Sequence, residues 1–279
     1  MQVKTVDYLT PDCAQKFVES LRTTGFGVIK NHPISQTLVE SIYNNWYTFF
    51  VSDEKHQYRY NVDTQDGYFP SEVSEVAKGH MVKDIKEYYH IYPWGQIPAQ
   101  LKADAMSYYQ MANTLATELL SWVEAHTPAE IAQHYSMPLS KMIESSRGTL
   151  LRVLHYPPLT GEEEPGAIRA AAHEDINLLT ILPAANEPGL QVKGSNGEWL
   201  DVPCDFGALI INTGDMLQEA SQGYFPSTTH RVINPTGGRQ DKSRISLPLF
   251  LHPNPDVVLS EHYTAREYLL ERLKELGVI

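Results

Sequence analysis

A succession of short apolar or alternating runs, separated by turn residues, fills the chain from residue 149 onward and restricts its fold more than any other feature. Several such strands at this spacing are typical of an antiparallel sandwich or jelly roll. We therefore expect a mainly β core with helices elsewhere. The predicted strands lie within residues 149–157, 177–184, 189–194, 198–203, 207–214, 227–234 and 244–252.

The first half of the chain indicates helices instead. Thr10-Pro11 and Gly25 are typical of the start and the stop of one helix, and Ser35 can cap a second helix. Residues 98–126 carry apolar side chains at three- and four-residue steps, which predicts the longest helix. Between these helices, residues 23–30 (TTGFGVIK) predict a short buried strand.

Two capping boxes complete this division of the chain. Thr127-Pro128-Ala129-Glu130 predicts the start of another helix, and Thr264-Ala265-Arg266-Glu267 predicts a helix near the C-terminus. We expect a helical N-terminal region over residues 1–145, packed on a β core over residues 146–279 that ends in this last helix.

The net charge and the cysteines restrict the binding partners and the compartment expected for this chain. The 279 residues carry a formal net charge of −12, which disfavours nucleic acid and anionic membranes as partners. The two cysteines, Cys13 and Cys204, form no Cys-x-x-Cys pair, so a reducing cytoplasmic location is expected. The first residues carry no apolar run, so no secretory signal is expected there, and no stretch approaches the about 20 apolar residues that span a bilayer.

Three residues form a candidate metal site. His173 and Asp175 are two apart, so in an extended chain both side chains lie on one face. His230 lies in a later predicted strand, and a jelly roll brings strands distant in sequence together. Two imidazoles and one carboxylate are the facial triad of non-haem iron(II) oxygenases, which leaves open positions for O2 and a cosubstrate. A single His-x-Asp pair is otherwise easily met by chance.

A candidate anion site accompanies this triad. Arg244 and Ser246 form the only Arg-x-Ser in the chain and lie on one face of the last predicted strand. A guanidinium with a nearby hydroxyl suits a carboxylate, which arginine binds with two parallel hydrogen bonds. Tyr156, in the run RVLHYPP at 152–158, is able to donate its hydroxyl to the same bound acid.

Together these residues resemble the iron(II)/2-oxoglutarate-dependent dioxygenases, specifically the isopenicillin N synthase-like (iron/ascorbate oxidoreductase) family. The resemblance covers most of the chain and follows the family's order of motifs. It is carried by His173-x-Asp175, His230-Arg231-Val232, Arg244-x-Ser246, the YPP at 156–158, and the segments 24–34, 67–91 and 214–232.

The resemblance implies a double-stranded β-helix in which His173, Asp175 and His230 bind Fe(2+). It implies that Arg244 and Ser246 bind the distal carboxylate of 2-oxoglutarate and that Tyr156 helps to hold this cosubstrate. The implied reaction decarboxylates 2-oxoglutarate to succinate and CO2 while O2 oxidises, by default hydroxylates, a small organic substrate. Ascorbate is an optional addition to this cofactor set.

The chain departs from the family pattern at two places. Family members often carry Asn at the position of Leu154, and Arg244 follows His230 at a longer spacing than in many members. Arg239 is nearer the usual spacing, but it lies in a Gly-rich turn and lacks a hydroxyl two residues on. We therefore favour Arg244 as the carboxylate ligand.

Two other functions remain open at this point. One is an oxidase of the same fold that needs no 2-oxoglutarate, as in isopenicillin N synthase and the ACC oxidases. The other is a non-catalytic β-barrel that only binds its ligand. Candidate substrate contacts are Tyr68, His80, Arg152 and His252, whereas Asp84, Lys86 and Glu87 are expected to form a surface charge network.

Overall fold

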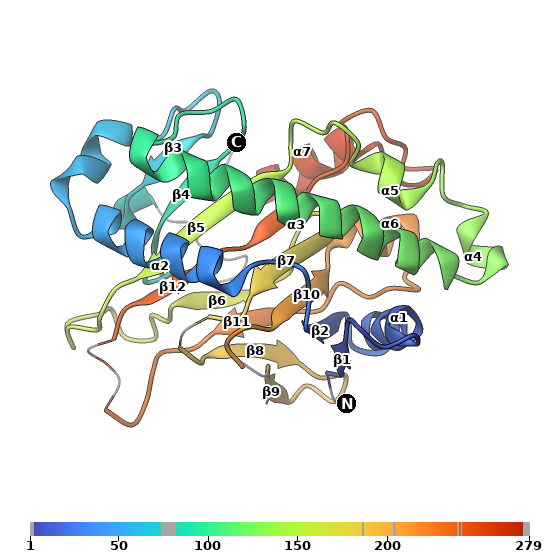
Figure 1. The fold of residues 1–279 in the computed structure, drawn as a ribbon, viewed down its shortest axis with the longest axis horizontal. Coiled ribbons are helices and arrows are strands. Elements are labelled where there is room, and N and C mark those ends of the chain that lie inside the picture. Colours follow the sequence, from blue (N-terminus) through green and yellow to red (C-terminus); the bar gives the residue numbers. More distant parts are fainter. Residues whose placement is uncertain are drawn as a thin grey trace.

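The structure is a computed structural model that describes residues 3–73, 82–185, 187–202, 205–238, 240 and 242–275 (Figure 1). The α-helices are α1 (Cys13–Thr24), α2 (Gln36–Phe50), α3 (Ala99–Ala125), α4 (Ala129–Ala132), α5 (Leu139–Met142), α6 (Asp215–Ala220) and α7 (Ala265–Glu275). Two 3-10 helices are η1 (Asp53–Tyr58) and η2 (Ser71–Val73). In this part of the chain, no helix is both long and apolar enough to cross a membrane.

The described strands form two facing sheets. They are β1 (Thr5–Asp7), β2 (Phe26–Lys30), β3 (Gly67–Phe69), β4 (Glu87–Ile91), β5 (Leu150–Tyr156), β6 (Ala170–His173), β7 (Leu179–Pro183), β8 (Leu190–Lys193), β9 (Trp199–Asp201), β10 (Leu209–Thr213), β11 (His230–Val232), β12 (Arg244–Ser246) and β13 (Leu249–Leu251). The large sheet has the order β1-β2-β10-β7-β13-β5-β4-β3, with β12 also paired to β5, and the small sheet has the order β6-β11-β8-β9. Every pair except the parallel β1–β2 is antiparallel, which confirms the predicted jelly-roll architecture.

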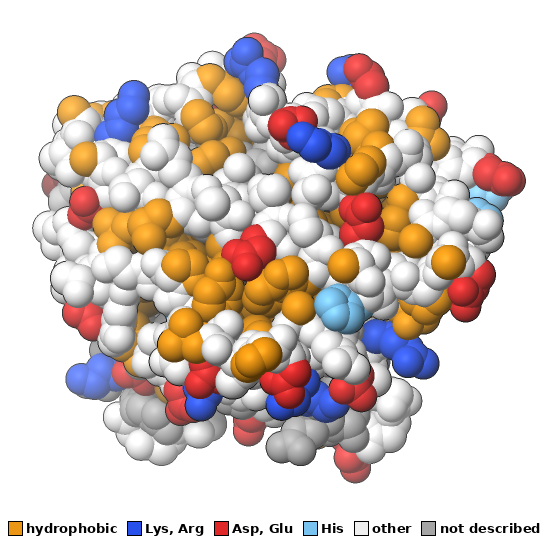
Figure 2. Space-filling view, turned by 45° about the vertical axis from the view of Figure 1, so that its right-hand side comes forward, with side chains coloured by type: hydrophobic (Ala, Val, Ile, Leu, Met, Phe, Trp, Pro, Cys, Tyr) orange, Lys and Arg blue, Asp and Glu red, His pale blue; other side chains and the backbone are white. Residues whose placement is uncertain are grey.

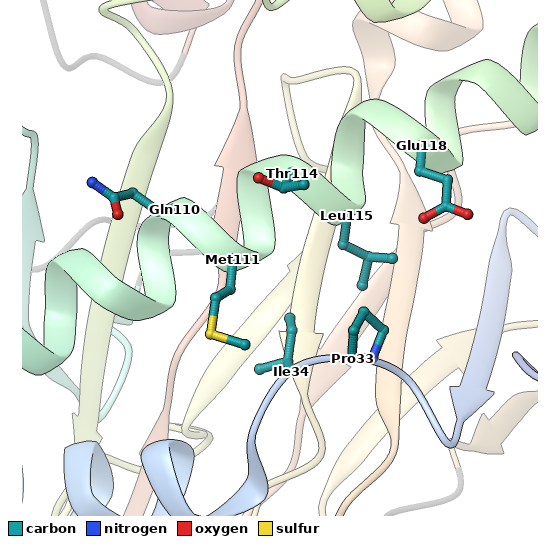
Figure 3. Close-up of a pocket in the computed structure, with 7 residues that line it drawn as sticks. All are labelled: Pro33, Ile34, Gln110, Met111, Thr114, Leu115 and Glu118. Carbon is teal, nitrogen blue, oxygen red and sulfur yellow. The ribbon is translucent and has the colours of Figure 1, made fainter.

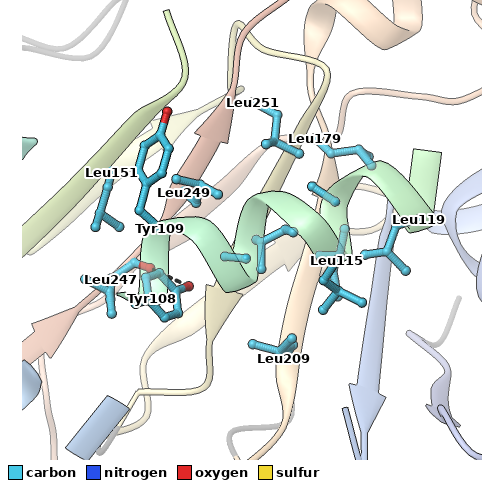
Figure 4. Close-up of a cluster of buried hydrophobic side chains, with 14 of the residues drawn as sticks. Tyr108, Tyr109, Leu115, Leu119, Leu151, Leu179, Leu209, Leu247, Leu249 and Leu251 are labelled. Carbon is cyan, nitrogen blue, oxygen red and sulfur yellow. Dashed lines mark hydrogen bonds between the residues drawn. The ribbon is translucent and has the colours of Figure 1, made fainter. Parts of the chain in front are cut away.

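Residue parity separates the two faces of the large sheet. Odd-numbered residues of its central strands, such as Leu179 and Leu249, pack against α3, which lies across these strands (Figures 1 and 4). Even-numbered residues, such as Ile210 and Leu154, face the small sheet and pack with Val192. Because side chains alternate along a strand, one face builds a helix-covered core and the other lines the space between the sheets.

The first 145 residues contribute strands as well as helices. β1 and β2 extend the large sheet beyond β10, and β4 and β3 extend it beyond β5. Only β2 is anticipated by the sequence. The run Glu87–Ile91 is buried at every position, so it lacks the polar–apolar alternation that indicates a strand.

Two helix boundaries form as the sequence predicts. Helix α1 ends at Gly25, which adopts a left-handed conformation with φ of 69°. Helix α7 has its capping box, in which the Thr264 backbone amide donates to Glu267 at 2.8 Å and the Glu267 amide donates to the Thr264 hydroxyl at 3.3 Å.

Two other predictions need correction. The box at Thr127 does not form, because the Thr127 hydroxyl donates backward to the Val123 carbonyl at 2.6 Å, and α4 is only four residues long. The single strand predicted over residues 244–252 is two strands, β12 and β13. Pro248 lies between them; it has no N–H to donate, although its carbonyl accepts from the Arg152 amide at 3.0 Å.

Candidate metal centre

His173, Asp175 and His230 meet in the space between the two sheets. His173 ends β6 and His230 begins β11, and the two are directly paired across the small sheet. Asp175 lies two residues beyond the end of β6. One ligand atom from each of the three residues lies within 4.8 Å of the others. The Nε2 atoms of His173 and His230 are each 3.8 Å from Oδ1 of Asp175.

The carboxylate of Asp175 is held through one oxygen only. Its Oδ2 accepts hydrogen bonds from the Thr180 hydroxyl at 2.5 Å and from the Asn212 amide at 2.8 Å. Oδ1 is thereby turned toward the two imidazoles. Burial alone would raise the pKa of Asp175, but His230, His173 and the two hydrogen bonds lower it, and the net direction is downward. The residue is therefore an anion with one oxygen available to a cation.

Both imidazoles present the same nitrogen to the centre. Nδ1 of His173 donates to the Ala171 carbonyl at 2.7 Å, and Nδ1 of His230 donates to the Thr228 carbonyl at 3.2 Å. Since a carbonyl can only accept, Nδ1 carries a hydrogen, and in the neutral ring Nε2 is the nitrogen with the lone pair. Burial, with a smaller effect of His230, lowers the pKa of His173 to about 4. Two imidazoles that each direct Nε2 toward the centre, together with one carboxylate, fit a divalent first-row metal such as iron(II).

The predicted carboxylate ligands also face the space between the sheets. Arg244 pairs with Tyr156 across β12 and β5, and Ser246 pairs with Leu154. Arg244, Ser246 and Tyr156 are all buried, and the guanidinium carbon of Arg244 lies 5.3 Å from the centre of the Tyr156 ring. Arg244 Nε donates to the Glu187 carbonyl at 3.1 Å, whereas its Nη1 has no partner. Arg239 lies outside the described residues.

Three residues beside these sites have no role in the sequence-based predictions. Thr180 and Asn212 are even-numbered positions of β7 and β10, so strand parity could have directed attention to them. Arg169 is fully buried, and its guanidinium carbon lies 6.0 Å from the centre of the same Tyr156 ring. Its only sequence signal is an arginine within an otherwise apolar run that leads to His173.

The candidate substrate contacts fall into three groups. Tyr68 packs in the helix-covered core and donates its hydroxyl to Glu87, so its expected contact with substrate is wrong. His80 lies outside the described residues. Arg152 and His252 are on the inner side of the large sheet. Arg152 Nε donates to Nε2 of His90 at 2.8 Å, and burial lowers the pKa of His252 to about 4.

The expected surface network is buried instead. Asp84, Lys86 and Glu87 are each at most 7% exposed. Lys86 Nζ lies 2.7 Å from Asp84, whose other oxygen accepts the Ala171 amide at 2.8 Å. Glu87 pairs with His155 at 2.7 Å. Charged residues were expected in solvent, but hydrogen-bonded partners of opposite charge offset the cost of burying them.

The surface also has a shallow pocket on the helix-covered side of the large sheet. Acidic and basic side chains are interspersed over the face in Figure 2, around an apolar area. The pocket in Figure 3 lies between α3 and the segment Pro33–Ile34, and Met111, Leu115 and Glu118 line it from the helix. It is on the helix-covered side of the large sheet, away from the triad, and its lining holds one carboxylate and no imidazole.

Comparisons with known proteins agree with this geometry. Residues 148–253 match the family model of the 2OG-Fe(II) oxygenase superfamily, and residues 6–112 match the N-terminal model described as "non-haem dioxygenase in morphine synthesis". A curated relative is 2-oxoglutarate-dependent dioxygenase 11 of rice, which is 30% identical over 269 residues, covering 90% of this chain and 71% of the relative.

Two solved structures extend the comparison to the whole fold. A protein from Shewanella oneidensis that is described as an oxygenase is 63% identical to this chain. The two structures align with a TM-score of 0.92 over 100% of both chains. A protein from Caulobacter crescentus assigned to the 2OG-Fe(II) oxygenases is 27% identical, with a TM-score of 0.81 over 98% of this chain and 99% of the other. The mainly β architecture is thus that of the double-stranded β-helix oxygenases.

Proposed function

Because this chain belongs to the 2OG-Fe(II) oxygenase superfamily, we propose that His173, Asp175 and His230 are the ligands of its iron. It is an iron(II)- and 2-oxoglutarate-dependent oxygenase, and such enzymes couple decarboxylation of 2-oxoglutarate to the oxidation of a small organic substrate by O2. The observation that carries the ligand assignment is the convergence of one nitrogen from each imidazole and one carboxylate oxygen within 4.8 Å of one another.

The surrounding residues fix the geometry of these ligands. Thr180 and Asn212 occupy one oxygen of Asp175, so this carboxylate offers a single oxygen to the metal. The Ala171 and Thr228 carbonyls orient the two rings. Such outer contacts fix the tautomer of a histidine ligand and its direction. A metal ion held by only these three donors would keep coordination positions for cosubstrate and O2.

Arg244, Ser246 and Tyr156 are proposed to hold 2-oxoglutarate. The distal carboxylate of the cosubstrate would accept from the Arg244 guanidinium and the Ser246 hydroxyl, which lie on one face of β12. Support comes from burial of all three side chains and from the unpartnered Nη1 of Arg244. A buried guanidinium donor without a partner is costly, and an incoming carboxylate would satisfy it.

The prime substrate is proposed to enter beside Arg152 and His252. Both lie on the inner face, and the Arg152 guanidinium carbon lies 5.4 Å from the Phe250 ring centre. Burial lowers the pKa of His252, and the charge of Asp175 acts in the opposite direction, as expected for an imidazole near the proposed ligands. Hydroxylation is the proposed outcome, and the cytosol is the proposed location.

Two measurements test this function. The chain with Fe(2+) should release succinate and CO2 from 2-oxoglutarate, and a metabolite screen read by succinate would reveal the substrate. Under anaerobic conditions, iron and 2-oxoglutarate should give a visible charge-transfer band. His173→Ala should abolish the band and turnover, while His134→Ala, at an exposed position, should keep both. Wild-type turnover in His173→Ala would contradict the ligand assignment.

A further inference from the structure

We propose that Arg169 is a second guanidinium of the 2-oxoglutarate pocket, so that Arg169 and Arg244 together bind the distal carboxylate. This inference rests on the proposed roles of Arg244 and Ser246. It adds a specificity-determining residue that neither the triad nor the Arg-x-Ser motif includes.

The hydrogen-bond donors of Arg169 are the first argument. The side chain is 0% exposed, and its Nη2 donates to the Lys242 carbonyl at 2.6 Å. Its Nε and Nη1 are buried and have no hydrogen-bond partner. Arg244 shows the same pattern, with Nη1 buried and unpartnered. Unsatisfied donors on buried charged groups are rare in folded proteins and indicate a missing acceptor.

The position of the two guanidiniums is the second argument. Both lie against the Tyr156 ring, with their central carbons 6.0 Å and 5.3 Å from its centre. Among the described residues, no carboxylate lies within salt-bridge distance of either one. Two like charges in a buried space repel each other unless an anion lies nearby.

The electrostatics agree with this geometry. Burial lowers the pKa of Arg169, and the charge of Arg244 lowers it further, while Tyr156 and Glu187 act in the opposite direction. The positive charge of Arg244 therefore lies close enough to act on Arg169. A ligand with a carboxylate at its far end would neutralise this local excess of positive charge and accept the orphan N–H groups.

A purely structural role is the alternative. Arg169 would then serve only to tie β6 to Lys242 and to cover the Tyr156 ring. The two roles differ in what they do to ligands, because a structural arginine affects all 2-oxo acids alike. An arginine that contacts the distal carboxylate affects only ligands that possess one.

The test compares 2-oxoglutarate with 2-oxopentanoate, in which a methyl group replaces the distal carboxylate. Dissociation constants are measured anaerobically with Fe(2+) from the charge-transfer band. Arg169→Met should weaken 2-oxoglutarate about 10- to 100-fold, as expected for lost charge-assisted hydrogen bonds, and should change 2-oxopentanoate by less than about 3-fold. Arg169→Lys keeps the charge but loses donors, so its loss should be smaller and equally selective.

Arg231→Met is the matched control. Arg231 also stacks on an aromatic ring, at 4.0 Å from the Trp199 centre, and also donates a hydrogen bond, to Gln191. It should leave both affinities unchanged. Equal weakening of both ligands in the Arg169 variants, or no weakening of either, would overturn the proposal. If Arg244→Met leaves 2-oxoglutarate affinity unchanged, the failure lies in the proposed carboxylate site itself.

Discussion

The Thr180 hydroxyl donates to Oδ2 of Asp175 at 2.5 Å, across the gap between β7 and the segment that follows β6. This contact joins the large sheet to a proposed metal ligand carried by the small sheet. It decides which carboxylate oxygen faces the two imidazoles.

Thr180→Val should therefore weaken iron binding. The substitution keeps the shape of the side chain but removes the donor, so Asp175 loses one of two contacts that fix its orientation. Loss of such an outer contact typically lowers metal affinity about 10- to 100-fold. Iron or cobalt titration of the metal-free protein measures the effect.

Thr213→Val provides the control for that experiment. Thr213 is a buried threonine of β10 in the same sheet, but its hydroxyl has no hydrogen-bond partner. Its replacement should leave metal affinity at the wild-type value. Equal losses in the two variants would indicate a general effect of the added methyl group and not a role for Thr180 in orienting Asp175.

Arg244→Leu should weaken 2-oxoglutarate binding by roughly 2–4 kcal/mol, because it removes a charge-assisted pair from a buried site. Iron affinity should stay unchanged, since Arg244 is not among the proposed ligands. Arg239→Leu is the informative comparison, because Arg239 is nearer the usual family spacing. A loss in the Arg239 variant with none in the Arg244 variant would reverse this assignment.

The sequence predicts the candidate metal ligands better than it predicts the residues that surround and orient them. His173, Asp175 and His230 could be selected because ligand chemistry restricts them to a few residue types in a recognisable spacing. Thr180, Asn212 and Arg169 could not, because an ordinary threonine, asparagine or arginine becomes informative only when a sheet brings it beside a ligand. Their importance arises from pairing between strands distant in sequence.

In the fold, too, features set by neighbouring residues could be predicted, whereas features set by residues far apart in the chain could not. The cap at Ser35 is a local signal, and its hydroxyl accepts the Leu38 amide as predicted. The burial of Lys86 beside Asp84 is not local. It depends on Asp84 reaching the Ala171 amide of β6 at 2.8 Å, a partner that lies 87 residues later in the chain. These charged side chains are buried because they lie near the small sheet, and their residue types alone do not predict this.

Gly25→Ala should destabilise the fold and disturb the metal centre together. Gly25 has φ of 69°, and a Cβ there would meet the Thr228 side chain and lie 2.6 Å from the Pro226 carbonyl. Thr228 carries the carbonyl that orients His230. We expect a loss of roughly 2–4 kcal/mol in unfolding free energy from the left-handed backbone plus overpacking, with weaker iron binding.

Gly161→Ala separates these two contributions. Gly161 also has a positive φ, of 84°, but nothing lies within 4 Å of its hypothetical Cβ. It should lose only the backbone part, on the order of 1 kcal/mol, and should bind iron normally. Urea unfolding and metal titration measure both variants. Normal iron affinity in Gly25→Ala would show that the Thr228 carbonyl tolerates displacement.

Asp215 gives the metal-free protein a pH-dependent stability. Burial raises the pKa of Asp215 to about 6; Ser227 acts against this, and the charges of Glu174 and Asp175 add to it. Because the folded-state pKa lies above the unfolded value of 3.8, the contribution of this group is fully present below about pH 4. It is lost as the pH rises through about 6, where the buried carboxyl ionises.

Asp215→Asn should therefore stabilise the metal-free protein at neutral pH by on the order of 2 kcal/mol, because it removes a buried charge whose Oδ1 has no partner. The gain should shrink toward zero as the pH falls below the unfolded pKa of 3.8, where the wild-type carboxyl becomes protonated in both states. Urea unfolding across this range measures it, with the exposed Asp256→Asn as control. A gain that is constant with pH, or that grows as the pH falls, would contradict the raised pKa.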